Sequence, residues 1–342
     1  MRGAHGTPMR SRLAGAAGGL LATALTLVAL VIVSEITLRL YLRRSLVYDI
    51  EMARYATEIK VASANPRIGH VHRPNAEATL MGVHVKINAD GFRDREYPIA
   101  RGDRRRVVVL GDSLTFGWGV EKAQTFEELL ETDLSTTIPT EIINFGTGNY
   151  NTEQEVALFR EKGTPYEPDA VVVFYFINDA EPTPRRSRGE FLARLRTTTF
   201  FWSRLQSALT SLGRNQSFRE YYAGLYAEDQ PGWTAARRAF IELRDVCRRR
   251  GIALRVVLLP DFHALRDYPF AAEHRTIVAF LAEHDVAVLD LAPFFGLEND
   301  PMRLWVAPDD AHPNAIAHAL IARYARDFIR GGIRGRTIAD AN

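Results

Sequence analysis

Residues 107–117 read Val-Val-Val-Leu-Gly-Asp-Ser-Leu-Thr-Phe-Gly and are the most informative stretch of the chain. The apolar, β-branched run 107–110 is typical of a buried strand. Ser113 follows the carboxyl end of that strand, where ligands bind in open parallel sheets. At the start of a helix, its hydroxyl and backbone N–H face outward with the positive end of the helix dipole. Ser113 is therefore a candidate nucleophile, although a serine in this position can also act only as a helix N-cap.

Strands and helices alternate from Arg105 onward. The strand segments are continuous apolar runs, which favours a sheet that is covered on both faces. The predicted strands are 107–110, 141–145, 170–177, 254–259 and 286–289, and the predicted helices are 125–134, 152–162, 233–250, 274–284 and 313–329. This alternation predicts an α/β fold, a three-layer α/β/α sandwich with about five parallel strands and right-handed crossovers.

A serine nucleophile needs a base and a carboxylate that orients the base. Residues 308–314, Pro-Asp-Asp-Ala-His-Pro-Asn, supply both before the last predicted helix. Asp309 and His312 are three residues apart, so an Asp309 contact with Nδ1 would leave Nε2 free to face Ser113. The alternative is an acidic N-cap followed by Pro313 at the first helical position.

Donors for an oxyanion are predicted on two further loops that follow strands. One is the loop 144–150, which can lend a backbone N–H. The other begins at Asn178, whose side-chain amide can donate, although an Asx-turn that ends the strand is the alternative for that residue.

Together these stretches resemble the SGNH or GDSL superfamily of esterases and lipases. The blocks that carry the resemblance occur in the family's order and are Gly111–Leu114, Gly146–Tyr150, Asn178-Asp179 and Asp309-x-x-His312-Pro313. The resemblance implies a flavodoxin-like α/β/α domain in which Ser113 attacks an ester carbonyl, His312 is the general base and Asp309 orients His312.

The same resemblance implies an oxyanion hole made by the Ser113 N–H, the Asn178 amide and one loop N–H. Where relatives place the glycine of the second block, this chain has either Gly148 or Asn149, and the sequence leaves both open. Residues 88–94 also resemble the segment that precedes the hydrolase domain in bacterial, membrane-tethered members of the superfamily.

The N-terminal region contains a long uncharged stretch, Leu13–Ser34, with arginines before and after it. At about 1.5 Å per residue, such a helix is long enough for the roughly 30 Å hydrocarbon core of a bilayer. Its β-branched end differs from a typical cleavage site, so an uncleaved signal-anchor over 13–36 is favoured over a cleaved signal peptide or a buried helix. A basic tail, 1–12, that stays inside predicts a single-pass protein with its catalytic domain on the extracytoplasmic side.

The remaining boundaries follow from changes in pattern. Residues 37–104 are predicted to form a juxtamembrane helix to about Val61 and a small β-rich collar with a strand at 83–87. The hydrolase domain is expected over 105–332, with an arginine- and aromatic-rich helical insertion or lid at 183–232, and a flexible tail at 333–342. A surface excursion packed on the sheet is an equal alternative for the insertion.

Composition excludes several classes of function. The net charge of +2 gives no indication of nucleic-acid binding. The one cysteine, Cys247, lies in a helical pattern and predicts a half-buried structural residue. The histidines lack metal-ligand spacing, so neither a metal nor a cofactor is expected.

The predicted reaction is the hydrolysis of carboxylic esters through an acyl-serine, with O-acyl or O-acetyl groups on a cell-envelope glycan or lipid as substrates. Two alternatives remain open: an O-acyltransferase that acts on an exported or surface glycan, and a non-catalytic glycan-binding protein of the same fold. The expected partners are the ester substrate and the membrane.

Overall fold

The computed structural model describes residues 8–41, 47–100, 102–183 and 217–334. Its centre is a five-stranded sheet in the order β6-β5-β7-β8-β9, and every neighbouring pair is parallel. The strands are β5 Arg105–Gly111, β6 Thr140–Asn144, β7 Ala170–Tyr175, β8 Ala253–Leu258 and β9 Ala287–Asp290. The predicted α/β fold with five parallel strands is confirmed.

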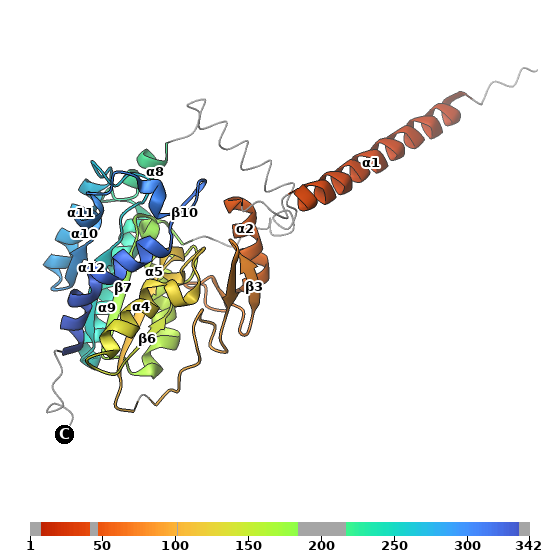
Figure 1. Cartoon of the computed structure of the whole chain (residues 1–342). Helices are drawn as coiled ribbons and strands as arrows, with labels where there is room; N and C mark the ends of the chain where they lie inside the picture. Colours follow the sequence, from red (N-terminus) through yellow and green to blue (C-terminus); the bar gives the residue numbers. More distant parts are fainter. Residues whose placement is uncertain (1–7, 42–46, 101, 184–216, 335–342) are drawn as a thin grey trace, which may run out of the picture.

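Helices cover both faces of this sheet (Figure 1). Because successive side chains of a strand point to opposite faces, Val107 and Val109 pack under α4 and α12, whereas Val108 and Leu110 pack under α5, α9 and α10. The bounds are α4 Phe126–Ser135, α5 Thr152–Leu158, α9 Pro231–Arg250, α10 Ala271–Glu283 and α12 Ala315–Arg334. Full burial of each large apolar side chain contributes about 1.5–3 kcal/mol, so the two layers hold the sheet from both sides.

Short helical segments connect these elements. They are α3 Ser113–Phe116, η2 Lys122–Gln124, η3 Phe159–Gly163, η4 Thr164–Tyr166, η5 Ile177–Ala180, α8 Phe218–Gly224, α11 Ala292–Phe295 and η6 Pro301–Leu304. Much of the predicted insertion, 184–216, and most of the predicted tail, 335–342, lie outside the described residues. The described part of the insertion contains α8, and α12 continues through Arg334.

The segment before the last helix differs from the prediction. It forms an antiparallel hairpin of β10 Trp305–Ala307 and β11 Asp310–Pro313, and α12 begins only at Ala315. Pro313 therefore ends a strand and is not the first residue of the helix. The side chain of Asn314 instead accepts from the backbone N–H groups of Ile316 and Ala317, so asparagine takes the N-cap role.

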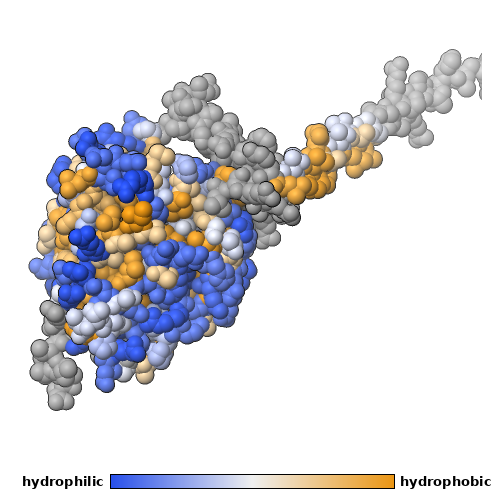
Figure 2. Space-filling model, viewed as in Figure 1, coloured by the Kyte–Doolittle hydropathy of each residue, from blue (hydrophilic) through white to orange (hydrophobic). Residues whose placement is uncertain are grey.

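The N-terminal helix α1, Pro8–Tyr41, contains one stretch, Ala17–Thr37, that is long and apolar enough to cross a membrane. Its apolar side chains are exposed, with Leu20 at 73% and Leu30 at 60% exposure, and they form an apolar band in Figure 2. By length and composition it fits a membrane span, and a signal sequence fits the same description.

Residues 47–100, called the collar here, lie between that helix and the sheet domain. They contain α2 Tyr48–Arg54, η1 Tyr55–Ile59 and two antiparallel hairpins. The hairpin strands are β1 Lys60–Ala62 with β2 His70–His72, and β3 Glu77–Leu80 with β4 Val83–Lys86. Helical structure in this segment ends at Ile59, where an end at about Val61 was expected, and the hairpin strands follow it.

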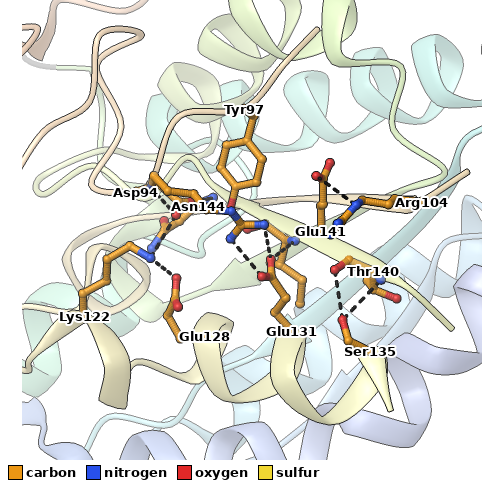
Figure 3. Close-up of polar contacts among 12 residues, drawn as sticks. Asp94, Tyr97, Arg104, Lys122, Glu128, Glu131, Ser135, Thr140, Glu141 and Asn144 are labelled. Carbon is orange, nitrogen blue, oxygen red and sulfur yellow. Dashed lines mark hydrogen bonds and ion pairs between the residues drawn. The ribbon is translucent and has the colours of Figure 1, made fainter. Parts of the chain in front are cut away.

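The collar is joined to the sheet domain by both apolar and polar contacts. Tyr55 and Val85 share a buried cluster with Phe116 and Trp118, which follow Ser113 in the chain. Asp94 accepts from the Asn144 backbone N–H at 3.0 Å and pairs with Lys122 at 3.1 Å. Figure 3 shows Asp94 between these two residues. The collar is therefore packed directly behind the segment that carries the candidate nucleophile.

Candidate active site

Ser113 lies at the turn from β5 into α3 and is 7% exposed. The Asp112 side chain accepts from the Leu114 N–H at 2.9 Å and so caps the short helix. A Cβ on Gly111 would lie 2.0 Å from the Thr115 hydroxyl oxygen and 3.0 Å from the carbonyl oxygen of Phe174. Glycine is thus required there by close packing, which fixes the direction in which the serine leaves the strand.

The predicted base is in place beside the serine. Ser113 Oγ and His312 Nε2 are 2.8 Å apart, although the two residues come from opposite ends of the sheet domain. The other ring nitrogen, Nδ1, is 2.5 Å from a carboxylate oxygen of Asp310. A carboxylate on Nδ1 fixes the tautomer in which Nε2 can accept the serine proton.

The carboxylate partner differs from the one predicted by sequence. Asp309 lies in the turn of the β10–β11 hairpin and is exposed, whereas Asp310 is 3% exposed. The reason is the strand: residues two apart point to the same face, so Asp310 and His312 share one face of β11 and Asp309 does not. The expectation of a helix-entering loop, in which a spacing of three would suit, was wrong.

Asp310 is held by two further donors. Trp118 Nε1 donates to Oδ2 at 2.8 Å and the His312 backbone N–H donates to Oδ1 at 3.1 Å. Burial alone would raise the pKa of Asp310, but the hydrogen bonds with His312 and Trp118 outweigh it and lower that pKa below its usual value. Asp310 therefore remains ionised and able to orient the imidazole.

An aromatic side chain of the collar packs against His312. The ring of Tyr48, on α2, lies over the His312 ring with 5.6 Å between centroids, and it contacts the Trp118 indole edge-on at 6.3 Å. Nothing in the sequence motifs pointed to Tyr48, because it lies far from every block of the family pattern.

The candidate oxyanion donors are not equally available. The Gly148 N–H donates to the Tyr55 hydroxyl at 2.9 Å and is therefore occupied. Among the described residues no partner is found for the Asn149 N–H, and Asn149 has a φ of 64°, a conformation usual for glycine. Asn178 Nδ2 donates one hydrogen to Asp112 at 3.1 Å, which leaves the second hydrogen of that amide.

The loop that carries Asn149 is held in place by hydrogen bonds of the Asn144 side chain. Asn144 donates through Nδ2 to the Thr115 carbonyl at 2.8 Å and accepts through Oδ1 from the Gly146 N–H at 2.7 Å. A Cβ on Gly146 would approach the Phe116 backbone nitrogen to 2.4 Å. The second block therefore packs directly against the nucleophile turn.

These groups open into one pocket of about 610 Å³. Its walls combine polar groups with aromatic rings. Its lining includes Tyr48, Ser113, Asn149, Asn178, Phe218, Tyr222, His263, Asp309 and His312. Asp309 thus lies at the pocket, although it does not contact the imidazole of His312.

A second acid–imidazole pair lies on the pocket wall. His263 Nδ1 is 2.7 Å from Asp261 Oδ1, and this hydrogen bond, the largest contribution, raises the pKa of His263. The ring also contacts Phe218 and Trp305. The structure places His263 at the pocket, with its side chain 53% exposed.

Two other features lie outside this chemistry. Cys247 is buried on α9, and burial raises the pKa of its thiol to about 12. Within the ranges that the structure describes, no group of three His, Cys, Asp or Glu side chains is arranged to hold a metal ion.

Comparison with known proteins agrees with the geometry of the site. A serine beside a histidine that is itself bound to a carboxylate, at the carboxyl edge of a parallel sheet, defines the class of serine hydrolases. A model of the GDSL-like lipase/acylhydrolase family matches residues 109–320, more than half of the chain. The chain belongs to this family, and it is a hydrolase that acts on ester bonds.

Solved structures with a similar fold include TesA, with 14% identity over 67% of this chain and 99% of that chain, at a TM-score of 0.44. An acetyl xylan esterase has 17% identity over 66% and 99% of the two chains, at 0.42. A lipase/acylhydrolase from Enterococcus faecalis has 15% identity over 68% and 99%, at 0.42. No curated protein sequence matches the chain.

Proposed function

We propose that the protein is a serine esterase in which Ser113 is the nucleophile, His312 the general base and Asp310 the residue that orients His312. The observation that carries this proposal is the continuous line of contacts from Ser113 Oγ to Nε2 at 2.8 Å and from Nδ1 to Asp310 at 2.5 Å. His312 takes the serine proton as Oγ attacks the ester carbonyl, and then gives it to the leaving alcohol. Water hydrolyses the acyl-serine in the second half of the cycle.

The oxyanion of each tetrahedral intermediate is proposed to lie among three donors, which are the N–H groups of Ser113 and Asn149 and the side-chain amide of Asn178. The support is that Asn149 and Asn178 line the pocket beside Ser113 and that the Gly148 N–H is already engaged. Loss of one such donor typically costs about 2.7–4 kcal/mol in the transition state.

We also propose that α1 is an uncleaved signal-anchor that keeps the hydrolase domain on the extracytoplasmic face of a membrane. The apolar stretch ends at Thr37, and Tyr48 already lines the pocket. Even a fully extended chain, at about 3.5 Å per residue, spans about 40 Å between these two residues. An anchored site is therefore restricted to esters close to the membrane surface.

The proposed substrates are O-acyl or O-acetyl esters on a cell-envelope glycan or lipid. The short reach from the anchor supports a membrane-proximal substrate. The pocket offers aromatic rings, Phe218 and Tyr222, beside the hydrogen-bonding pair Asp261 and His263. Such a lining suits a ligand that has both apolar surface and hydroxyl groups.

A fluorophosphonate probe tests the nucleophile directly. We expect the probe to label the full-length wild-type chain at Ser113, and we expect this labelling to be lost in Ser113→Ala. If the probe does not react with the wild-type chain, the site is not an activated serine, and a glycan-binding role without catalysis replaces the esterase.

Hydrolysis and acyl transfer share the acyl-serine and differ in the acceptor. The pair Asp261–His263 on the pocket wall could hold an acceptor hydroxyl, which is the observation in favour of transfer. Turnover of p-nitrophenyl acetate should be compared with and without a soluble glycan. The esterase proposal expects full turnover in water alone, whereas turnover that depends on the glycan identifies an O-acyltransferase.

A further inference from the structure

Lys60, at the start of β1 in the collar, reaches across to the loop that carries Asn149. Its ammonium nitrogen Nζ lies 2.7 Å from the carbonyl oxygen of Gly148 and 2.7 Å from Oδ1 of Asn149. The same nitrogen lies over the ring of Tyr55, 4.4 Å from its centroid. One lysine thus holds both the backbone and the side chain of this loop.

Other collar residues also contact the backbone N–H and carbonyl groups of Gly148. The Gly148 N–H donates to the Tyr55 hydroxyl, which lies 2.6 Å from His72 Nε2. His72 Nδ1 lies 3.1 Å from the Gly91 carbonyl, so Nδ1–H donates there and Nε2 accepts from Tyr55. His70 Nε2 is 3.1 Å from the Gly148 carbonyl. A Cβ on Gly148 would lie 2.6 Å from the Tyr55 ring, so loop and collar are in close contact.

The carbonyl of Gly148 and the N–H of Asn149 belong to one peptide group. Resonance in that group moves electron density from nitrogen to oxygen, and a cation on the oxygen increases this shift. The N–H then becomes a stronger hydrogen-bond donor, and the effect is larger away from bulk water. A charge on Lys60 is therefore transmitted through the peptide to the N–H of Asn149, a residue that lines the pocket.

We propose that Lys60 is a positioning residue for ester cleavage, which holds and polarises the Gly148–Asn149 peptide so that the Asn149 N–H stabilises the oxyanion. This inference rests on the proposed function. Lys60 does not touch the ester; it acts through the peptide, and its contribution appears mainly in the transition state, where the negative charge develops. It also holds Asn149 at its positive φ, a backbone conformation that costs free energy in a residue other than glycine.

The charge of Lys60 is expected to depend on pH. Burial of the ammonium group lowers the pKa of Lys60 to about 7. The groups that face it are His70 and His72 on β2, Tyr55 on η1 and the Asn149 amide on the loop. Burial, together with the charge of Lys60, lowers the pKa of both histidines to about 3, and burial raises that of Tyr55. Near neutral pH, Lys60 is thus the member of this group that changes charge.

The lowered pKa of Lys60 determines the direction in which activity is expected to change with pH. Below about pH 7 Lys60 is an ammonium and polarises the peptide, and above it the amine is neutral and the polarisation weakens. We therefore expect kcat/KM of the wild type to fall as pH rises through the pKa of Lys60. An arginine at this position stays charged at every pH of interest.

The test uses the full-length chain in detergent micelles with p-nitrophenyl acetate. Lys60→Met should lower kcat about 10- to 100-fold, a fraction of what loss of a whole oxyanion donor costs, with KM changed less than about threefold. The fall in kcat/KM above neutral pH should disappear in this variant. Lys60→Arg should restore part of kcat and retain activity to higher pH than the wild type. The matched control is Lys86→Met, which removes an exposed lysine of the same collar and should behave as wild type.

Two results overturn the proposal. The first is that Lys60→Met has the same kcat and the same pH profile as Lys86→Met. The second is that kcat/KM of Lys60→Arg falls at alkaline pH in the same way as that of the wild type. This second result excludes the proposed role of Lys60 even if Lys60→Met does not fold. Fluorophosphonate labelling separates this inference from the proposed function. A wild type that labels at Ser113 while the lysine variants behave as wild type removes only the role of Lys60, whereas an unlabelled wild type removes the esterase itself.

Discussion

The sheet domain and the collar contribute to the same pocket in different ways. The sheet domain supplies Ser113, His312 and Asp310, and the family match begins at residue 109 and so lies entirely within it. The collar lies outside that match, yet Tyr48 packs on the His312 ring and Lys60 holds the loop of Asn149. The groups proposed to react with the ester thus come from the shared fold, whereas part of their support comes from a segment next to the N-terminal helix.

The largest expected effect belongs to the sheet domain. Ser113→Ala and His312→Ala should each lower esterase turnover by at least about 10³-fold, because the nucleophile and its base act as a unit. Thermal melting of both variants should stay within a few degrees of the wild type. Turnover by either variant at the wild-type rate would falsify the proposed mechanism.

The next effect distinguishes the two neighbouring aspartates. Asp310→Asn should lower kcat about 10²- to 10⁴-fold, because an amide no longer fixes the imidazole tautomer. Asp309→Asn, at the exposed turn of the hairpin, should stay within about threefold of the wild type. Steady-state kinetics of the pair provide the measurement, and the reverse order of effects would restore the carboxylate first expected from the sequence.

Asn178 tests the oxyanion donors that the sheet domain provides. Asn178→Ala should lower kcat about 10²-fold with little change in KM, since the side-chain amide acts where charge develops. The double variant with Lys60→Met should show whether the two act on one oxyanion. We expect a loss smaller than the product of the single losses, and a strictly multiplicative loss would mean that the two residues contribute independently of each other.

The smallest expected effect is that of Tyr48 in the collar. Tyr48→Ala should lower kcat/KM about three- to tenfold, because His312 loses an aromatic ring that packs on it, while Tyr48→Phe should stay near the wild type. Ring packing of this kind contributes about 0.5–1.5 kcal/mol. If the phenylalanine variant were as impaired as the alanine variant, the hydroxyl rather than the ring would be the contributing group.

Much of the fold was predictable because its signals are local. The uninterrupted apolar runs at 107–110 and 170–177 identify buried strands, and their alternation with helices identifies a parallel sheet. The elements fall where predicted to within a few residues. The hairpin at 305–313 was missed because β10 and β11 are very short and Pro313 is also a favourable first residue of a helix.

The site was predictable in part for the same reason. Ser113, Asn178 and His312 each follow a local motif, and the structure places all three at one pocket. The choice between Asp309 and Asp310 could not be made from sequence spacing alone. It depends on whether the backbone at that point is a loop or a strand, and hence on which side chains share a face. Had a strand been predicted at 310–312, it would have indicated Asp310, because residues two apart in a strand point to the same face.

The sequence by itself determined the class of fold, the serine and histidine of the site, and an N-terminal helix long enough to span a membrane. Those properties are encoded in runs of neighbouring residues, because the spacing of apolar residues and the residue types at turns determine local structure. Only the tertiary structure decided which aspartate meets His312, which of Gly148 and Asn149 keeps a free N–H, and that Tyr48, Tyr55 and Lys60 reach the site. These outcomes depend on contacts between residues far apart in the chain, whose geometry is fixed only when the collar packs on the sheet domain.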